Sequence, residues 1–259
     1  MTAPHSPIDW SSLEAVLFDL DGVLTDTARL HVMAWTEAFD GFLQRHAAGG
    51  GPAFVPFDPE DDYHRYVDGK PRYDGVRDFL RSRGIDLPEG SPSDPPGDAT
   101  IQALGNAKNE RVNALFDTAG VDVFEGSVAF LDAVLASGRR AAVVTSSANC
   151  DAVLAAAGLE GRFEAQVDGN VARARGLPGK PAPDTFLAAA AELGVPAARA
   201  AVIEDALSGV EAGRRGGFGV VIGVDRKGVA DDLRGAGADV VCQDLAELVE
   251  GLRPRGSAS

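Results

Sequence analysis

The stretch AVLFDLDGVLTD, residues 15–26, decides the fold of this chain. Its apolar first part, at 15–20, is typical of a strand that helices cover on both faces. Asp19 and Asp21 come at the carboxyl end of this strand, and the two-residue repeat of an extended chain can direct both carboxylates to the same side. Gly22 then allows a tight turn that brings backbone amides close to an anion. Acidic turns are common, so the pair taken alone is also compatible with a solvated strand end.

Further short apolar runs recur in the second half of the chain, and each is followed by a helical pattern. We expect strands at 141–145, 200–203, 219–224 and 238–242, and helices at 127–136, 149–157, 184–193, 206–215 and 244–252. Glycines stand just past four of these helix ends, where a left-handed cap favours them: Gly138, Gly158, Gly194 and Gly216. Strands that alternate with helices predict an α/β fold with right-handed crossovers and a doubly wound, Rossmann-like parallel sheet.

The chain between residues 27 and 121 has a different pattern. Its periodic segments look helical, and no apolar strand interrupts them: 28–44, 74–83 and 101–119. Two long loops separate them, 46–57 with three consecutive glycines and 88–98 with four prolines. Such loops are uncommon in compact domains and are often functional or mobile. We predict an α-helical cap domain at 27–121, inserted into a core domain made of 1–26 and 122–259.

The charge balance excludes several classes of partner. The chain has 24 basic and 39 acidic residues, a net charge of −15, and so repels nucleic acid and anionic membrane surfaces. Two cysteines, Cys150 and Cys242, make no disulfide framework or zinc site, and we expect reduced, buried thiols. The start of the chain lacks the pattern of a secretory signal, and no apolar stretch reaches the roughly 20 residues of a membrane span. We expect a soluble, cytoplasmic monomer with no nucleic-acid or membrane partner.

Three further strand ends carry polar side chains. TSSAN, residues 145–149, is a hydroxyl-rich junction before a helix, where a hydroxyl and backbone amides can hold a phosphate. Lys180 stands between a glycine and a proline, in a loop rigid enough to hold its ammonium in a fixed place. Glu204 and Asp205 end a buried strand, and hard oxygen ligands of this kind suit Mg²⁺. Taken alone, the first could be an N-cap cluster and the last an acidic pair favoured by a helix dipole.

The order of these groups along the chain favours one common site. Ligands of an open α/β sheet bind outside the carboxyl ends of its strands, where these residues are expected. Paired carboxylates that point into one crevice repel each other and need a cation, a shared proton or both. The set contains a nucleophile, an acid–base group, an anion cradle, a countercharge and a metal site.

These motifs resemble, in kind and order, those of the haloacid dehalogenase superfamily of phosphoryl-transfer enzymes. DLDG at 19–22, the strand that ends in Thr145, the lysine of GKP and the ED pair before a small-residue helix carry the resemblance. Within the superfamily, DLDGVLTDTARLHVMAW at 19–35, with the cap motifs GKPR at 69–72 and KN at 108–109, is similar to the β-phosphoglucomutase family. The resemblance spans nearly the whole chain except the two long loops. It departs at Ala148, where the family has a basic side chain.

The resemblance implies a role for each core motif. Asp19 would attack phosphorus to give an aspartyl-phosphate, and Asp21 would act as general acid and base. Thr145 and Lys180 would neutralise charge on the equatorial oxygens of the phosphoryl group.

It also implies Mg²⁺ as the cofactor. The ion would lie between Asp19, the backbone carbonyl of Asp21 and Asp205. Glu204 would coordinate the ion or a group beside it.

The resemblance places the substrate contacts in both domains. Arg72 and Lys108 are candidates for the non-transferring phosphate of a bisphosphate. His31 and Trp35 lie about one helical turn apart and could share a face near the entrance, although either could belong to the cap core instead. The expected substrate-binding residues are His31, Trp35, Gly69, Arg72, Lys108, Thr145, Ser146, Ser147, Asn149 and Lys180.

Mutases and phosphatases of this type differ in whether a sugar hydroxyl or water attacks the aspartyl-phosphate. A second phosphate anchor at Arg72 and Lys108 favours a mutase that converts β-glucose 1-phosphate to glucose 6-phosphate through the 1,6-bisphosphate. A sugar-phosphate phosphatase is the alternative, for which Ala148 and the cap loops leave room. A non-enzymatic phospho-acceptor module similar to receiver domains is a remote third possibility, since such modules are much shorter and lack a cap.

Overall fold

The computed structural model describes residues 8–252, which form two compact units. The α/β unit takes the described residues up to Asp26 and from Asp122 onward, and the helical unit takes Thr27–Val121. The first seven residues, on which part of the expectation about a secretory signal rests, lie outside the described part of the chain. None of the helices in residues 8–252 has both the length and the apolar character needed to cross a bilayer.

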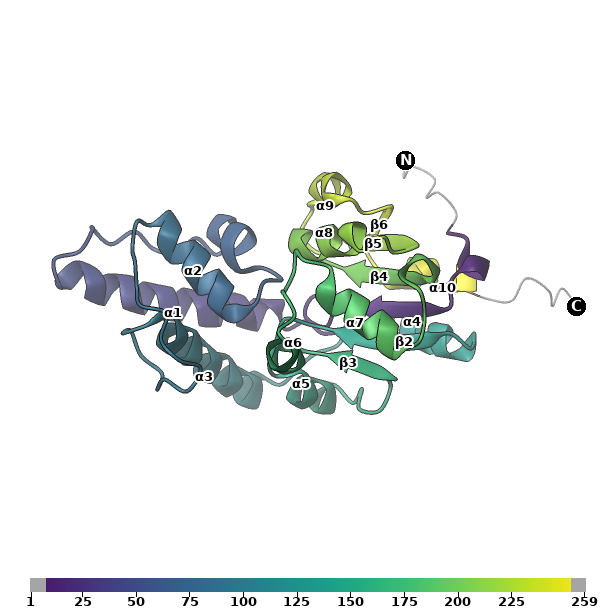
Figure 1. Cartoon of the computed structure of the whole chain (residues 1–259), viewed down its shortest axis with the longest axis horizontal. Coiled ribbons are helices and arrows are strands. Elements are labelled where there is room, and N and C mark those ends of the chain that lie inside the picture. Colours follow the sequence, from purple (N-terminus) through teal and green to yellow (C-terminus); the bar gives the residue numbers. More distant parts are fainter. Residues whose placement is uncertain (1–7, 253–259) are drawn as a thin grey trace, which may run out of the picture. The chain divides into compact units, whose positions relative to one another are not determined.

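A parallel sheet forms the centre of the α/β unit. Its strands, within the described residues, are β1 (Ala15–Phe18), β2 (Arg140–Val144), β3 (Ala165–Val167), β4 (Ala200–Glu204), β5 (Val220–Val224) and β6 (Val240–Cys242). Their spatial order is β3-β2-β1-β4-β5-β6, and every neighbouring pair is parallel (Figure 1). Along the chain, the sheet starts at the central strand β1 and extends first to one edge and then to the other. This confirms the doubly wound, Rossmann-like sheet.

Helices connect the strands of this sheet. They are α4 (Glu125–Ala136), α5 (Cys150–Ala156), α6 (Gly169–Arg175), α7 (Asp184–Glu192), α8 (Leu207–Arg215), α9 (Ala230–Ala236) and α10 (Val249–Leu252), with 3₁₀ turns η1 (Trp10–Ser12), η3 (Ala197–Arg199) and η4 (Leu245–Leu248). The expected helix at 244–252 is wrong in its first half. There Asp244 and Glu247 form a capping box around the 3₁₀ turn η4, and only the last four residues are α-helical.

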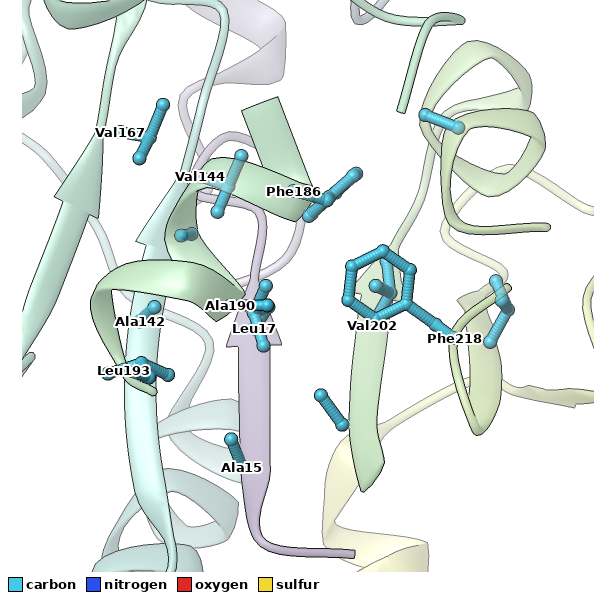
Figure 2. Close-up of a cluster of buried hydrophobic side chains, with 14 of the residues drawn as sticks. Ala15, Leu17, Ala142, Val144, Val167, Phe186, Ala190, Leu193, Val202 and Phe218 are labelled. Atoms are coloured by element: carbon cyan, nitrogen blue, oxygen red, sulfur yellow. The ribbon is translucent and has the colours of Figure 1, made fainter. Parts of the chain in front are cut away.

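The core holds β1 rigidly from both faces. On one face Leu17 belongs to an apolar cluster with Val202 of β4 and with Phe186 of α7 (Figure 2). On the other face Phe18 packs edge-on against Phe130 of α4, with ring centroids 6.0 Å apart. Because successive strand residues point to opposite faces, a fully buried strand needs this continuous apolar sequence. Asp19, which follows β1, is therefore held at a defined position at the carboxyl end of the strand.

The sequence pattern does not predict β3, α6 or α9. β3 has three residues with a polar glutamine at its centre, which is too short a run to show a period. The two helices have seven residues each, less than two full turns of amphipathic pattern.

The glycine caps are confirmed at three of the four predicted positions. Gly138, Gly158 and Gly194 have positive φ values of 76°, 67° and 65°. Gly216 does not, because its φ is −73° and the left-handed residue after α8 is Gly217, with φ 67°. Gly216 is instead required by space, since a Cβ there would lie 2.6 Å from the Phe218 ring.

Both cysteines are buried, free thiols, as expected. Burial raises the pKa of Cys242 to about 12, and burial likewise raises the pKa of Cys150 well above its usual value. Both side chains are therefore protonated at neutral pH, and they serve as small apolar groups in the core.

Three helices build the helical unit: α1 (Ala28–Ala48), α2 (Arg72–Ser82) and α3 (Ile101–Ala119), with a π-helical turn η2 (Tyr63–Val67) before α2 (Figure 1). Their core is aromatic. The ring centroid of Phe39 lies 4.1 Å from that of Phe79 and 5.0 Å from that of Trp35. α1 runs four residues beyond the expected end at Gln44, so the glycine-rich connection begins only at Gly49.

Candidate active site

The carboxyl ends of β1, β2 and β4 lie side by side where the strand order reverses. Asp19 directly follows β1, and its amide donates to the carbonyl of Ile203 at 3.0 Å. Thr145 directly follows β2, while Glu204 is the last residue of β4. β1 pairs with both of these strands, so the three side chains belong to one edge of the sheet. This is the position at which doubly wound folds bind their ligands.

The Lys180 ammonium lies at the centre of this group. Its Nζ is 2.5 Å from Oδ1 of Asp19 and 2.6 Å from Oε1 of Glu204, and it donates to the Val144 carbonyl at 3.1 Å. Only 2% of the lysine is exposed. Burial alone would lower the pKa of this ammonium, but the carboxylates of Asp19 and Glu204 outweigh it and raise the pKa above its usual value. The charge of Lys180 is therefore retained throughout the physiological range.

Three buried carboxylates at this edge could hold a metal ion. Asp19, Glu204 and Asp205 each offer an oxygen atom, and these atoms lie within 4.8 Å of one another. Burial, more than any other cause, raises the pKa of Asp19 well above its usual value; Lys180 opposes this, and the neighbouring carboxylates add to it. A further cation would relieve this repulsion, since Lys180 is outnumbered by the carboxylates around it. The set of hard oxygen donors fits Mg²⁺.

Two glycines leave the space that these carboxylates occupy. At Gly209 a Cβ would lie 1.8 Å from Oε1 of Glu204, and at Gly22 a Cβ would lie 2.2 Å from Oδ2 of Asp205. Gly22 also has φ 88°, which L-residues rarely adopt. Glu204 is fixed further by the amides of Asp205 and Ala206, which both donate to its Oε2 at 3.1 Å. The turn after β1 and the first turn of α8 therefore both need glycine to make room for the acidic cluster.

Asp21 and Thr145 meet beside the buried cluster. The Thr145 hydroxyl donates to Oδ2 of Asp21 at 3.3 Å and accepts the amide of Ser147 at 3.0 Å. Asp21 is half-buried, whereas Asp19 is buried, so the two carboxylates of this motif occupy different environments. Two such groups can take different roles in acid–base chemistry.

The predicted junction 145–149 is a compact turn of hydroxyl and amide groups. Ser146, Ser147 and Asn149 are half-buried, and the Asn149 amide donates to Oγ of Ser147 at 3.2 Å. The backbone amide of Gly169 donates to the Ser147 carbonyl at 2.8 Å, which ties the junction to the start of α6.

Sequence reasoning misses Arg226, which supports the turn after Asp21. Its Nε donates to the Gly22 carbonyl at 3.1 Å, and its Nη2 donates to the Val23 carbonyl at 3.4 Å. The guanidinium carbon lies 3.6 Å from the ring centroid of Phe124. The neighbouring Lys227 has its Nζ 3.7 Å from Oδ2 of Asp205. The polar run DRKG at the end of the fifth strand, 225–228, is the signal that could reveal both residues.

In the helical unit the structure brings together three of the predicted residues. Nζ of Lys108 is 2.9 Å from Nδ1 of His31 and 5.0 Å from the ring centroid of Trp35. Only 4% of Lys108 is exposed, which is unusual for a lysine. Trp35 also stacks on Phe39, so it is a core residue of this unit as well as a neighbour of Lys108.

Two further predicted residues lie at the start of α2. Arg72 is the first residue of the helix and is half-buried, with its guanidinium carbon 5.2 Å from the ring centroid of Tyr73. Gly69 precedes it with φ 68°, a left-handed conformation that allows the chain to turn from η2 into α2.

Comparison with known proteins indicates an enzyme that acts as a phosphotransferase. The chain belongs to the family of haloacid dehalogenase-like hydrolases, whose sequence model matches residues 13–217. The resemblance to this superfamily, and to the β-phosphoglucomutases within it, is confirmed.

Named relatives cover almost the whole chain. A β-phosphoglucomutase of Mycobacterium tuberculosis is 55% identical over 240 residues, which are 92% of each protein. The crystal structure of CbbY from Rhodobacter sphaeroides in complex with xylulose-(1,5)bisphosphate is 26% identical, with a TM-score of 0.67 over 93% of this chain and 100% of that one. A β-phosphoglucomutase from Clostridium difficile, at 24% identity, shares the fold, with a TM-score of 0.70 over 91% of this chain and 93% of that one.

We predict that Gly22→Ala is more damaging than the same change at another left-handed glycine. At Gly138 no atom lies within 4 Å of an added Cβ, so Gly138→Ala is opposed only by the left-handed backbone conformation. It should lower the free energy of unfolding by about 1 kcal/mol. Gly22→Ala must also displace the Asp205 carboxylate and should cost about 2–4 kcal/mol. Urea unfolding measures both variants. Equal losses would contradict the packing of Gly22 against Asp205.

We predict that Arg226→Met lowers the free energy of unfolding by about 2–3 kcal/mol, because two carbonyls behind Asp21 lose a charged donor. The matched control is Arg234→Met in α9, whose exposed ion pair with Asp231 should contribute less than about 1 kcal/mol. Urea unfolding at neutral pH compares the two. An Arg226 variant as stable as the Arg234 variant would show that the guanidinium does not support this turn.

Proposed function

We propose that this chain is a Mg²⁺-dependent β-phosphoglucomutase that interconverts β-glucose 1-phosphate and glucose 6-phosphate through the 1,6-bisphosphate. The observation that carries the proposal is the Asp19 carboxylate, held against the buried Lys180 ammonium at the switch point of the sheet. The mycobacterial relative named β-phosphoglucomutase, identical at 55% of positions over 92% of both chains, supports the choice of reaction.

Asp19 is the proposed nucleophile. One of its carboxylate oxygens attacks phosphorus in line, the bond between phosphorus and the sugar oxygen breaks, and an aspartyl-phosphate forms. Lys180 contacts this carboxylate, and Thr145 follows the neighbouring strand β2; both can neutralise charge on the equatorial phosphoryl oxygens. The ammonium also favours the ionised, nucleophilic form of Asp19, in opposition to burial.

Asp21 is the proposed acid–base group. It gives a proton to the leaving sugar oxygen in the first half-reaction and takes one from the attacking hydroxyl in the second. Its hydrogen bond with the Thr145 hydroxyl, at 3.3 Å, holds the carboxylate beside the reacting group. Its half-buried position leaves it accessible to the sugar.

Asp19, Glu204 and Asp205 are the proposed side-chain ligands of Mg²⁺, together with the backbone carbonyl of Asp21. When bound, the ion would supply positive charge to the transferring phosphoryl group. Lys180 stays with Asp19 and Glu204, so it shares the neutralisation of this acidic edge.

The helical unit, 27–121, is proposed as the cap domain that carries the second phosphate anchor. Arg72 and Lys108 supply the cations, His31 and Trp35 hold the Lys108 ammonium in place, and Gly69 with the 145–149 junction completes the substrate contacts. A mutase needs such an anchor, because its sugar bisphosphate must bind in two orientations. Cap closure would keep water from the aspartyl-phosphate while sugar is present.

A sugar-phosphate phosphatase is the second candidate. It is favoured by the likeness to CbbY, whose structure holds xylulose-(1,5)bisphosphate. Both candidates share the aspartyl-phosphate and differ in the group that attacks it.

We further propose a cytoplasmic monomer, consistent with buried free thiols and a net charge of −15.

One assay separates these two reactions. The protein is incubated with β-glucose 1-phosphate, MgCl₂ and a trace of β-glucose 1,6-bisphosphate, and glucose 6-phosphate and inorganic phosphate are followed separately. The mutase predicts glucose 6-phosphate over many turnovers with little phosphate. Phosphate released at the rate of substrate loss would identify the phosphatase, and neither product would contradict both.

Asp19→Asn should reduce turnover by roughly a thousandfold or more, since the amide oxygen is a poor nucleophile. The matched control is Asp231→Asn, an exposed aspartate of α9, which should retain full activity. Initial rates in the same assay test the pair. An Asp19→Asn enzyme near wild-type activity would refute the nucleophile.

A further inference from the structure

The proline-rich loop of the helical unit, 88–98, is fastened to the start of α3. The carbonyl of Pro88 accepts the amide of Ile101 at 2.9 Å, and that of Glu89 accepts the amide of Gln102 at 3.1 Å. These amides belong to the first turn of the helix, where no intrahelical partner exists. The long loop is thus held at the point where α3 begins.

Asn106 connects this loop to α2. Its Nδ2 donates to the Pro92 carbonyl at 3.2 Å and to the Asp94 carbonyl at 2.8 Å. Its Oδ1 accepts the hydroxyl of Tyr73 at 2.8 Å. Both ends of the amide are used, so its orientation is determined by the network. One side chain of α3 therefore joins the proline-rich loop to the second residue of α2.

Gly105 allows Tyr73 to lie directly on the backbone of α3. A Cβ at Gly105 would be 2.6 Å from Cδ1 of the Tyr73 ring and 3.4 Å from Cδ of Arg72. Glycine is unfavourable inside a helix, so Gly105 lowers the stability of α3 while it leaves room for the Tyr73 ring. The guanidinium carbon of Arg72 lies 5.2 Å from the centroid of the same ring, within the range of a cation–π contact.

We propose that Tyr73 and Asn106, braced by the proline-rich loop, are positioning residues that hold the Arg72 guanidinium ready for the second phosphate of a sugar bisphosphate. The proposal rests on the function proposed above. An arginine side chain has many rotamers, and ordering it upon binding costs affinity. A guanidinium already held against a fixed ring incurs less of this cost, and its planar fork suits phosphate. The loop would therefore set the affinity for substrates that carry a second phosphate.

The test compares two phosphoryl donors. The first measurement is the concentration of β-glucose 1,6-bisphosphate that gives half-maximal isomerisation. The second is the rate of phosphoenzyme formation from acetyl phosphate, which has no second phosphate. Tyr73→Leu removes the ring and should raise the half-maximal bisphosphate concentration about three- to tenfold. Tyr73→Phe retains the ring but loses the Asn106 hydrogen bond, so it should raise that concentration about two- to threefold.

Neither Tyr73 variant should change the acetyl phosphate rate by more than about twofold, since the ring acts through Arg72 alone. The matched control is Tyr66→Phe, which removes the hydroxyl of another half-buried tyrosine of this unit and should change neither measurement. If the acetyl phosphate rate of Tyr73→Phe fell as much as its half-maximal bisphosphate concentration rose, the change would indicate general structural damage and overturn the proposal. The proposal would also be overturned if Tyr73→Leu left the half-maximal bisphosphate concentration unchanged.

A double variant separates this proposal from the function on which it rests. Arg72→Ala should raise the bisphosphate concentration, and Arg72→Ala/Tyr73→Leu should raise it no further, because the ring has nothing left to position. Additive effects would overturn the positioning role while the mutase reaction stands. No effect of Arg72→Ala would remove the phosphate anchor itself and the positioning role with it. Absence of glucose 6-phosphate formation by the wild-type protein would instead contradict the proposed reaction.

Discussion

The site depends on one buried cation, the Lys180 ammonium, among the carboxylates of Asp19 and Glu204. A charge that is 2% exposed is stable only with close partners, and its partners lie at the carboxyl ends of two adjacent strands of the sheet. Without this ammonium, the two carboxylates would repel each other in a buried environment. The ion pairs therefore tie the loop before α7 to the ends of β1 and β4 and set the geometry in which an acidic cluster can exist.

The sheet explains why this arrangement forms at one place. The sheet begins at β1 and extends to both edges, so the strand that precedes Thr145 and the strand that ends at Glu204 become the two neighbours of the strand that precedes Asp19. Close approach then requires glycine at positions 22 and 209, and Arg226 fixes the carbonyls behind Asp21. Fold, acidic cluster and proposed chemistry are thus consequences of the same strand order.

The sequence predicts the elements that show a hydrophobic period and the residues that stand at the end of a predicted strand. The buried runs of β1 and β4 locate Asp19 and Glu204, and Lys180 is indicated by its place between glycine and proline. Features made by tertiary contact have no such signal. Arg226 lies in a polar run at the end of β5, which only hints at a role, and Asn106 has no signal at all; the carbonyls that each contacts are visible only in the structure. β3 has too few residues for its alternation to be recognised, and α6 is too short to show a helical period.

Direct location of the phosphoryl group during turnover tests the central claim. The protein is quenched rapidly in acid while it converts β-glucose 1-phosphate with MgCl₂ and the 1,6-bisphosphate, and its peptides are mapped by mass spectrometry. We expect an acid-stable, base-labile phosphoryl group on Asp19, present at a level that follows the rate of turnover. A phosphoryl group found consistently on another residue, or none during steady turnover, would contradict the account.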